Sequence, residues 1–213
     1  MIVYGQNPVR EAIRGPRRVL RTWEDLPADE LERICGSPDH QGICADVEPY
    51  RYADPDALFA DDDALVIGLD EVQDPHNLGA VCRVAEVAGA AGVVIPERRS
   101  AEVTPAVCKA SAGAVEHLAV ARVRNLADWL AGAKKADAWV YGAATEGIPY
   151  DRPDYRGRVV LVLGSEGKGL RPRVAAACDE LVALPVRGRV ASLNVSTAAA
   201  ALVYGILQFR MQS

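Results

Sequence analysis

The segment VVLVLGSEGKGL, residues 159–170, decides the fold. It opens as an apolar run rich in valine that never alternates with polar residues, and it ends in a turn with three glycines. A run of this kind is typical of a strand that is buried on both faces of a parallel sheet. Four further runs have the same character, at residues 64–70, 91–97, 138–144 and 181–186.

Helical stretches separate these runs. We expect helices over residues 78–89, 104–112, 126–133 and 171–178, and a last helix that begins at Ser196 or Thr197 and reaches Arg210. Strands that alternate with helices predict a doubly wound α/β domain around a parallel sheet. In such sheets a ligand binds beyond the carboxyl ends of the strands, so the loops that follow the strands are the candidate sites.

The first 53 residues predict a separate small α/β unit. Strands are expected at residues 2–5, 17–23 and 41–52, with helices at 7–14 and 26–35, the first of them capped by Asn7. The acidic stretch that follows suggests a linker. We therefore expect a small domain at residues 1–53, a linker at 54–62 and a larger domain at 63–213.

Composition limits the class of protein. Half of the 213 residues are hydrophobic and the mean hydropathy is +0.01, which is typical of a soluble globular chain. No apolar run has the length of a membrane span, and the first residues lack the layout of a signal peptide, so we expect a cytoplasmic protein without a membrane partner. The five cysteines never form a CxxC pair and the three histidines have no metal-like spacing, so no metal site is expected.

Charge is distributed unevenly along the chain. Residues 1–62 contain 7 basic and 13 acidic side chains, yet Arg10, Arg14, Arg17, Arg18 and Arg21 lie together within twelve positions. The cluster is either an ordinary solvated surface or a local footprint for phosphates. The net charge of −5 for the whole chain does not by itself favour binding to nucleic acid.

Three loops at strand ends carry the polar residues that could do chemistry. In the first, Asn77 is placed to cap a helix, Gly79 allows close approach of another backbone, and Arg83 is either an ion-pair partner, a surface residue or a functional group. The second is the glycine-rich turn after residue 163, which matches neither a GxGxxG turn nor a P-loop. The third places four capping-type residues within six positions, at 192–197, which is more than one helix needs.

These three loops resemble the three sequence motifs of the SPOUT superfamily, specifically its SpoU-type RNA ribose 2′-O-methyltransferases. The likeness covers about 150 residues, and the motifs occur in the right order and spacing. The matching positions are Asp70, Asp74, Pro75, Asn77, Gly79, Ala80 and Arg83; Leu163, Gly164, Ser165, Glu166, Gly167 and Gly169; and Leu184, Pro185, Gly188, Ser192, Leu193, Asn194, Val195 and Ser196.

The resemblance implies a fold, a cofactor and a partner. It implies a trefoil-knotted parallel-sheet domain, with the C-terminal segment threaded through a loop, and a homodimer built on the first and last helices of that domain. It implies S-adenosylmethionine as cofactor, held by Gly164, Gly169, Leu184 and Leu193. The N-terminal part resembles the family's ribosomal-protein-like RNA-binding domain, shortened by a helix and a strand, with Arg10, Arg14, Arg17 and Arg18 as candidate RNA contacts.

The resemblance also implies a reaction, which is methyl transfer to a ribose 2′-hydroxyl of RNA. It is closest to enzymes that modify a guanosine of large-subunit rRNA; the alternatives are 2′-O-methylation of tRNA and a non-catalytic RNA-binding module. The catalytic candidates are Arg83, Asn77, Glu166, Ser192 and Asn194. Arg83 matches the family's catalytic arginine. It serves either as a general base, which requires a large pKa shift, or as a cation that stabilises an alkoxide or binds a phosphate.

Overall fold

The computed structural model describes residues 1–212, and its main feature is a parallel sheet of six strands. The strand order is β6-β5-β4-β8-β7-β9, and every neighbouring pair is parallel. The predicted α/β class is therefore confirmed. The strands are β4 (Leu65–Asp70), β5 (Gly92–Pro96), β6 (Val120–Val123), β7 (Trp139–Pro149), β8 (Val159–Gly164) and β9 (Glu180–Ala183).

Strand β6 was not predicted from the sequence. It is four residues long and includes Arg122, so it lacks the uninterrupted apolar run of its neighbours. It forms the edge of the sheet beside β5, where Arg122 reaches the ring of Tyr52 and pairs with Glu102 at 3.1 Å. A strand at an edge needs burial on fewer sides, so its sequence carries a weaker signal.

Helices cover both faces of the six-stranded sheet, so it forms the middle layer of three. The two hydrophobic clusters of the core lie on opposite faces of the sheet, because alternate residues of each strand belong to alternate clusters. One face packs against α3 (Pro75–Val87), α4 (Pro105–Ala110) and α7 (Val195–Gln212). The other packs against α5 (Leu126–Lys135), α6 (Pro172–Ala175) and the short 3₁₀ helix η2 (Pro55–Phe59).

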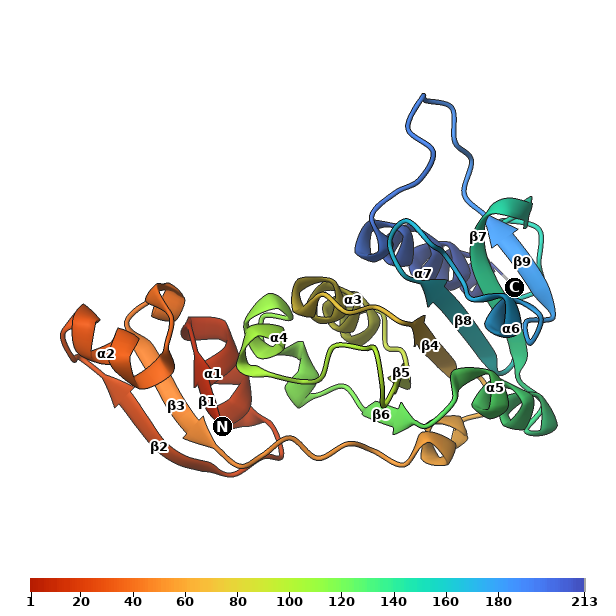
Figure 1. Cartoon of the computed structure of the whole chain (residues 1–213). Helices are drawn as coiled ribbons and strands as arrows, with labels where there is room; N and C mark the ends of the chain where they lie inside the picture. Colours follow the sequence, from red (N-terminus) through yellow and green to blue (C-terminus); the bar gives the residue numbers. More distant parts are fainter. Residues whose placement is uncertain (213) are drawn as a thin grey trace.

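A second, smaller sheet forms the N-terminal end of the elongated molecule (Figure 1). It is antiparallel with order β1-β3-β2. Its elements are β1 (Ile2–Tyr4), α1 (Gln6–Arg14), β2 (Val19–Glu24), α2 (Ala28–Cys35), η1 (Pro38–His40) and β3 (Ile43–Val47). The prediction that Asn7 caps α1 is wrong: the helix begins at Gln6, and its N-cap is Gly5, which lies at φ 92°.

The small sheet is firmly attached to the region of α4 and the 3₁₀ helix η3 (Ala114–Glu116). Arg17 and Glu116 form a buried ion pair in which Arg17 Nε donates to Glu116 Oε2 at 2.7 Å. Burial lowers the pKa of Arg17, but the hydrogen bond and charge of Glu116 raise it more, so the net pKa lies above its ordinary value. Apolar residues of the small sheet join the same hydrophobic cluster as α3 and α7. Both sheets therefore share one core.

The segment between the two sheets also packs closely. Leu58 and Phe59 of η2 are buried, and the Phe59 ring stacks on Trp129 of α5 at 5.8 Å between centroids. This contact ties residues 55–59 to the far face of the large sheet. Among residues 1–212, no helix is long and apolar enough to cross a membrane.

Candidate active site

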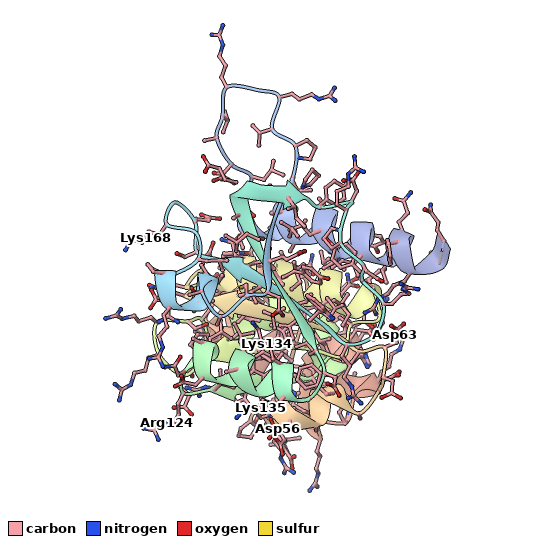
Figure 2. The ribbon with its side chains drawn as sticks, turned by 90° about the vertical axis from the view of Figure 1, so that its right-hand side faces the viewer. Asp56, Asp63, Arg124, Lys134, Lys135 and Lys168 are labelled. Atoms are coloured by element: carbon pink, nitrogen blue, oxygen red, sulfur yellow. The ribbon has the colours of Figure 1, made fainter. Side chains whose placement is uncertain are left out.

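A cavity of about 650 Å³ lies where the loops after β8 and β9 meet the start of α7. Its wall is mostly apolar, with polar groups at the mouth. Figure 2 shows the loop between β9 and α7 rising above the body of the molecule, and Lys168 on the loop that follows β8. Six of the predicted site residues line this cavity: Gly164, Glu166, Gly169, Leu184, Ser192 and Leu193.

Gly164 ends β8 and allows the next loop to fold back on it. The loop closes through a bridge between Ser165 and Gly169, in which Gly169 N donates to Ser165 O at 2.9 Å. A Cβ on Gly164 would lie 2.1 Å from the carbonyl carbon of Gly169, far inside the normal limit. Only glycine fits here, because the returning backbone occupies the side-chain position.

An ion pair with a buried carboxylate fixes the end of this loop. Asp70, at the carboxyl end of β4, is fully buried and accepts hydrogen bonds from Arg171 Nε at 2.7 Å and from the Arg171 backbone N–H at 2.8 Å. These contacts raise the pKa of Arg171. Sequence reasoning did not single out Arg171. A charged residue at the end of an apolar strand indicates a buried partner, but nothing local identifies which residue it is.

The three motif segments converge on a cluster of three side chains. Glu166 Oε1 accepts hydrogen bonds from the side-chain amides of Asn77, at 2.8 Å, and of Asn194. Asn194 Nδ2 also lies 3.0 Å from Asn77 Oδ1. Residues 117 positions apart in the chain therefore form one hydrogen-bonded group, and Glu166 of this group lines the cavity.

Two predicted helix starts need correction. Asn77 does not cap α3; the N-cap is Asp74, whose carboxylate accepts from the backbone N–H of His76 at 2.9 Å, and Pro75 follows it. The last helix begins at Val195 rather than at Ser196 or Thr197. Asn194 acts as its cap, because Asn194 Oδ1 accepts from the backbone N–H of Ser196 at 2.8 Å.

Gly79 makes the close approach that its sequence position predicted. A Cβ at this position would lie 2.5 Å from Ala110 Cβ and 2.9 Å from the backbone nitrogen of Ser111. Helices α3 and α4 thus pack with their backbones nearly in contact. This packing holds α3, and with it Asn77, against the core.

Arg83 lies on α3 but not in the cluster. It is exposed, and no residue between 1 and 212 gives it a hydrogen bond or an ion pair. Six residues of helix separate it from Asn77, so the two side chains point about 120° apart and lie about 9 Å apart along the axis. It shares its helix face with Val87, four residues on, which is 64% exposed.

Of the four arginines predicted to contact RNA, three are exposed and one is buried. Arg10, Arg14 and Arg18 are exposed, and Arg14 pairs with Glu11 at 3.0 Å. The prediction for Arg17 is wrong, because its side chain is buried between the small sheet and Glu116. A cation in this position joins the two parts of the chain and cannot face a phosphate on the surface.

Known proteins with the same pattern identify the family. The model of the SpoU rRNA Methylase family matches residues 64–204. YacO of Bacillus subtilis, assigned to the TrmH family of tRNA/rRNA methyltransferases, is 36% identical and the match covers 98% of this chain and 95% of YacO. That alignment spans 242 positions against 213 residues here, so YacO carries at least 29 residues that this chain lacks.

Solved structures agree with the sequence relatives. A TrmH-family protein from Porphyromonas gingivalis superimposes with a TM-score of 0.83 at 28% identity, covering 100% of this chain and 90% of that one. The SpoU methyltransferase AviRb from Streptomyces viridochromogenes has the same fold, with a TM-score of 0.84 at 23% identity, over 100% of this chain and 91% of AviRb.

The fold and the site together define an RNA methyltransferase of the α/β class, with its candidate site at the carboxyl ends of parallel strands. The chain belongs to the SpoU rRNA methylase family, within the SPOUT superfamily that its three motifs indicated.

Proposed function

We propose that this chain transfers a methyl group from S-adenosylmethionine to the 2′-hydroxyl of a ribose in RNA. One observation carries the proposal. Asn77, Glu166 and Asn194 come from three separate motif segments and meet in one hydrogen-bonded cluster at the edge of a cavity of about 650 Å³. The trefoil knot that the resemblance implies, with α7 threaded through a loop, is part of this proposal.

The cavity suits S-adenosylmethionine in size and in lining. Pockets for small ligands usually measure about 300–1,000 Å³ and are mostly apolar with a few polar groups. Leu184 and Leu193 offer apolar contact here, and the loop that begins at Gly164 offers backbone N–H and C=O groups. When bound, the cofactor supplies a methyl group on a sulfonium. AviRb, which has the same fold, was crystallised with AdoMet.

The protein's own task in this reaction is to position the ribose hydroxyl and to stabilise the charge that develops on it. Glu166 holds the amides of Asn77 and Asn194 in place, so both amides have a defined direction beside the cavity. Ser192 lines the same cavity with an exposed hydroxyl. We assign these four residues to orienting the substrate.

Arg83 enters this scheme through a homodimer. Within one chain it points away from the cluster and shares an exposed helix face with Val87. The neighbouring helix α7 exposes Tyr204 and Met211, which are 49% and 87% accessible. Apolar side chains gathered on two adjacent helices favour an interface, and such an interface carries Arg83 of each subunit toward the partner's site. A guanidinium there is placed to act on the ribose hydroxyl, to stabilise the alkoxide or to hold a phosphate.

We expect the RNA substrate to be large-subunit rRNA, with a guanosine as target, in preference to tRNA. Residues 1–53 form the small RNA-contacting part in this proposal, residues 54–62 the connection and residues 63–213 the methyltransferase domain. Arg10, Arg14 and Arg18 are exposed on the small part and are available to phosphates. Relatives at 34–39% identity are named for tRNA and rRNA together, which agrees with either substrate.

Methyl transfer with radiolabelled S-adenosylmethionine tests the proposal directly. Unmodified transcripts of large-subunit rRNA and of tRNA serve as substrates, and the labelled position is mapped by its resistance to alkaline cleavage, which a 2′-O-methyl group confers. We expect label on ribose, and in rRNA. Label on a base would contradict the ribose assignment, and absence of transfer to every RNA would contradict the enzyme assignment.

A further inference from the structure

The loop between β9 and α7 is a local concentration of unpaired positive charge. Residues 185–193, PVRGRVASL, include two arginines and no acidic residue, on a chain whose net charge is −5. Every residue of this loop is exposed. Arg187 and Arg189 make no hydrogen bond or ion pair with the part of the chain that the structure describes. The same holds for the side chain of Lys168, which lines the same cavity as Arg187.

Elsewhere in this chain, cations close to the core have partners. Arg17 pairs with Glu116, Arg171 with Asp70 and Arg158 with Asp62. The cavity mouth differs, because the acidic side chain there, Glu166, already accepts two amide hydrogen bonds. Lys168 and Arg187 line one cavity, and Arg189 follows Arg187 on the same exposed loop. Like charges repel one another, and an anion bound among them offsets this repulsion.

The loop is positioned to reach a large ligand. Ala183 O accepts from Tyr150 N at 3.1 Å at one end, and Asn194 caps α7 at the other. Between these anchors, residues 185–193 make no hydrogen bond within residues 1–212. Figure 2 shows the loop standing clear of the rest of the molecule. Arg187 lines the cavity and Arg189 does not, so the loop carries positive charge from the cavity to the surface beyond it.

We propose that Arg187 and Arg189, with Lys168 on the facing loop, bind the phosphates of the RNA next to the ribose that enters the cavity. This inference rests on the proposed function and deepens it, because it assigns RNA docking to the rim of the methyltransferase cavity in addition to the small N-terminal part. Phosphate contacts position an RNA substrate without reading its sequence. The positive side chains of this rim are complementary in charge to such phosphates.

The test measures how RNA affinity depends on salt for the Arg187→Gln/Arg189→Gln variant, with a short RNA hairpin as probe. Each phosphate contact contributes about 0.7–0.9 to the slope of log affinity against log salt, so we expect the slope to fall by roughly 1.4–1.8. The Arg187→Lys/Arg189→Lys variant keeps both charges and should keep the slope. The control is Arg124→Gln/Lys135→Gln, which removes two exposed charges at the bottom of the view in Figure 2, away from the loop at its top, and should leave the slope unchanged.

Two further readouts keep the inference separate from the proposed function. Affinity for S-adenosylhomocysteine, measured by calorimetry, should be unchanged in the Gln pair; an equal loss of cofactor affinity would assign the loop to the cofactor and overturn the inference. An unchanged salt slope in the Gln pair, with wild-type enzyme active on RNA, would overturn the inference alone. A wild-type protein that binds cofactor but transfers no methyl group to any RNA would instead overturn the proposed function.

Discussion

Replacing Gly164 by alanine should disrupt the cofactor cavity while leaving the rest of the fold intact. The new Cβ would lie 2.1 Å from the Gly169 carbonyl carbon, whereas real Cβ contacts stay beyond 3.0 Å, so the loop must move by about 0.9 Å. The atoms in the way are backbone, and no side-chain rotation relieves the clash. The movement breaks the hydrogen bond from Gly169 N to Ser165 O, which is 2.9 Å long, and displaces the loop backbone that faces the cavity.

The size of the effect follows from these contacts. Loss of the loop-closing hydrogen bond and of one backbone contact to the cofactor, at about 1 kcal/mol each, weakens cofactor binding by roughly 30-fold. A misplacement of about 1 Å next to the reacting atoms reduces turnover further, by roughly 100-fold. The loop follows the carboxyl end of β8 and faces the cavity, outside the packed core, so the melting temperature should fall much less than affinity does.

Calorimetry with S-adenosylmethionine on Gly164→Ala and Gly188→Ala measures this effect. Gly188 lines the same cavity, yet a Cβ there meets no atom within 4 Å, so this matched control should bind within a factor of two of wild type. Circular dichroism and a thermal melt report whether the Gly164 variant is folded. A folded Gly164→Ala protein with wild-type affinity and turnover would refute the steric reasoning.

Four other predictions follow from the site and the core. Arg83→Ala should abolish methyl transfer in a single-turnover assay while cofactor affinity stays within a few-fold of wild type. Equal loss of methyl transfer and of cofactor affinity would make Arg83 structural. Arg83→Lys should keep partial activity where a charge alone is required. Glu116→Gln leaves Arg17 as a buried, uncompensated charge and should destabilise the fold by about 3–5 kcal/mol, or about 6–20 °C in Tm. A variant with the wild-type Tm would contradict the role of this ion pair. Tyr204→Asp should convert a dimer to monomers in analytical ultracentrifugation, with loss of activity; a dimer that survives would place the interface elsewhere. Burial raises the pKa of Cys82 to about 12, so the folded state keeps a proton that the unfolded thiol loses near pH 8.5. The contribution of this thiol to the free energy of unfolding is therefore complete below pH 8.5 and is lost as pH rises toward 12. The loss amounts to about 2 kcal/mol at pH 10. Urea unfolding at several pH values should show this loss in wild type and less of it in Cys82→Ala. Equal dependence of the free energy of unfolding on pH in the two proteins would contradict the prediction.

The parallel sheet could be predicted because burial on both faces leaves a local trace in the sequence. Strands β4, β5 and β8 are buried at nearly every position, and their apolar runs show no alternation. Edge strand β6 left a weaker trace and was missed. The residues of the cavity were predicted from a resemblance, since the motifs stand next to the ends of those strands.

The sequence did not predict which polar side chains contact one another. Asp74 and Asn77 are both competent helix caps, as are Asn194 and Ser196, so local chemistry does not choose between them. The tertiary structure chose Asp74 and Asn194 as caps, and it turned Asn77 toward Glu166, 89 positions away.

The chain by itself determined the α/β class, the family motifs and the positions of its buried strands, because apolar periodicity and motif spacing are local properties. Only the folded chain decided that Arg17 is buried against Glu116, that Arg83 is exposed and unpaired within residues 1–212, and that Gly164 faces a returning backbone. The physical reason is that the free energy of a charge or a close contact depends on its surroundings in space. Those surroundings come from segments about 100 residues apart for Arg17 and Glu116, and such distant pairings leave no periodic signal in a single sequence.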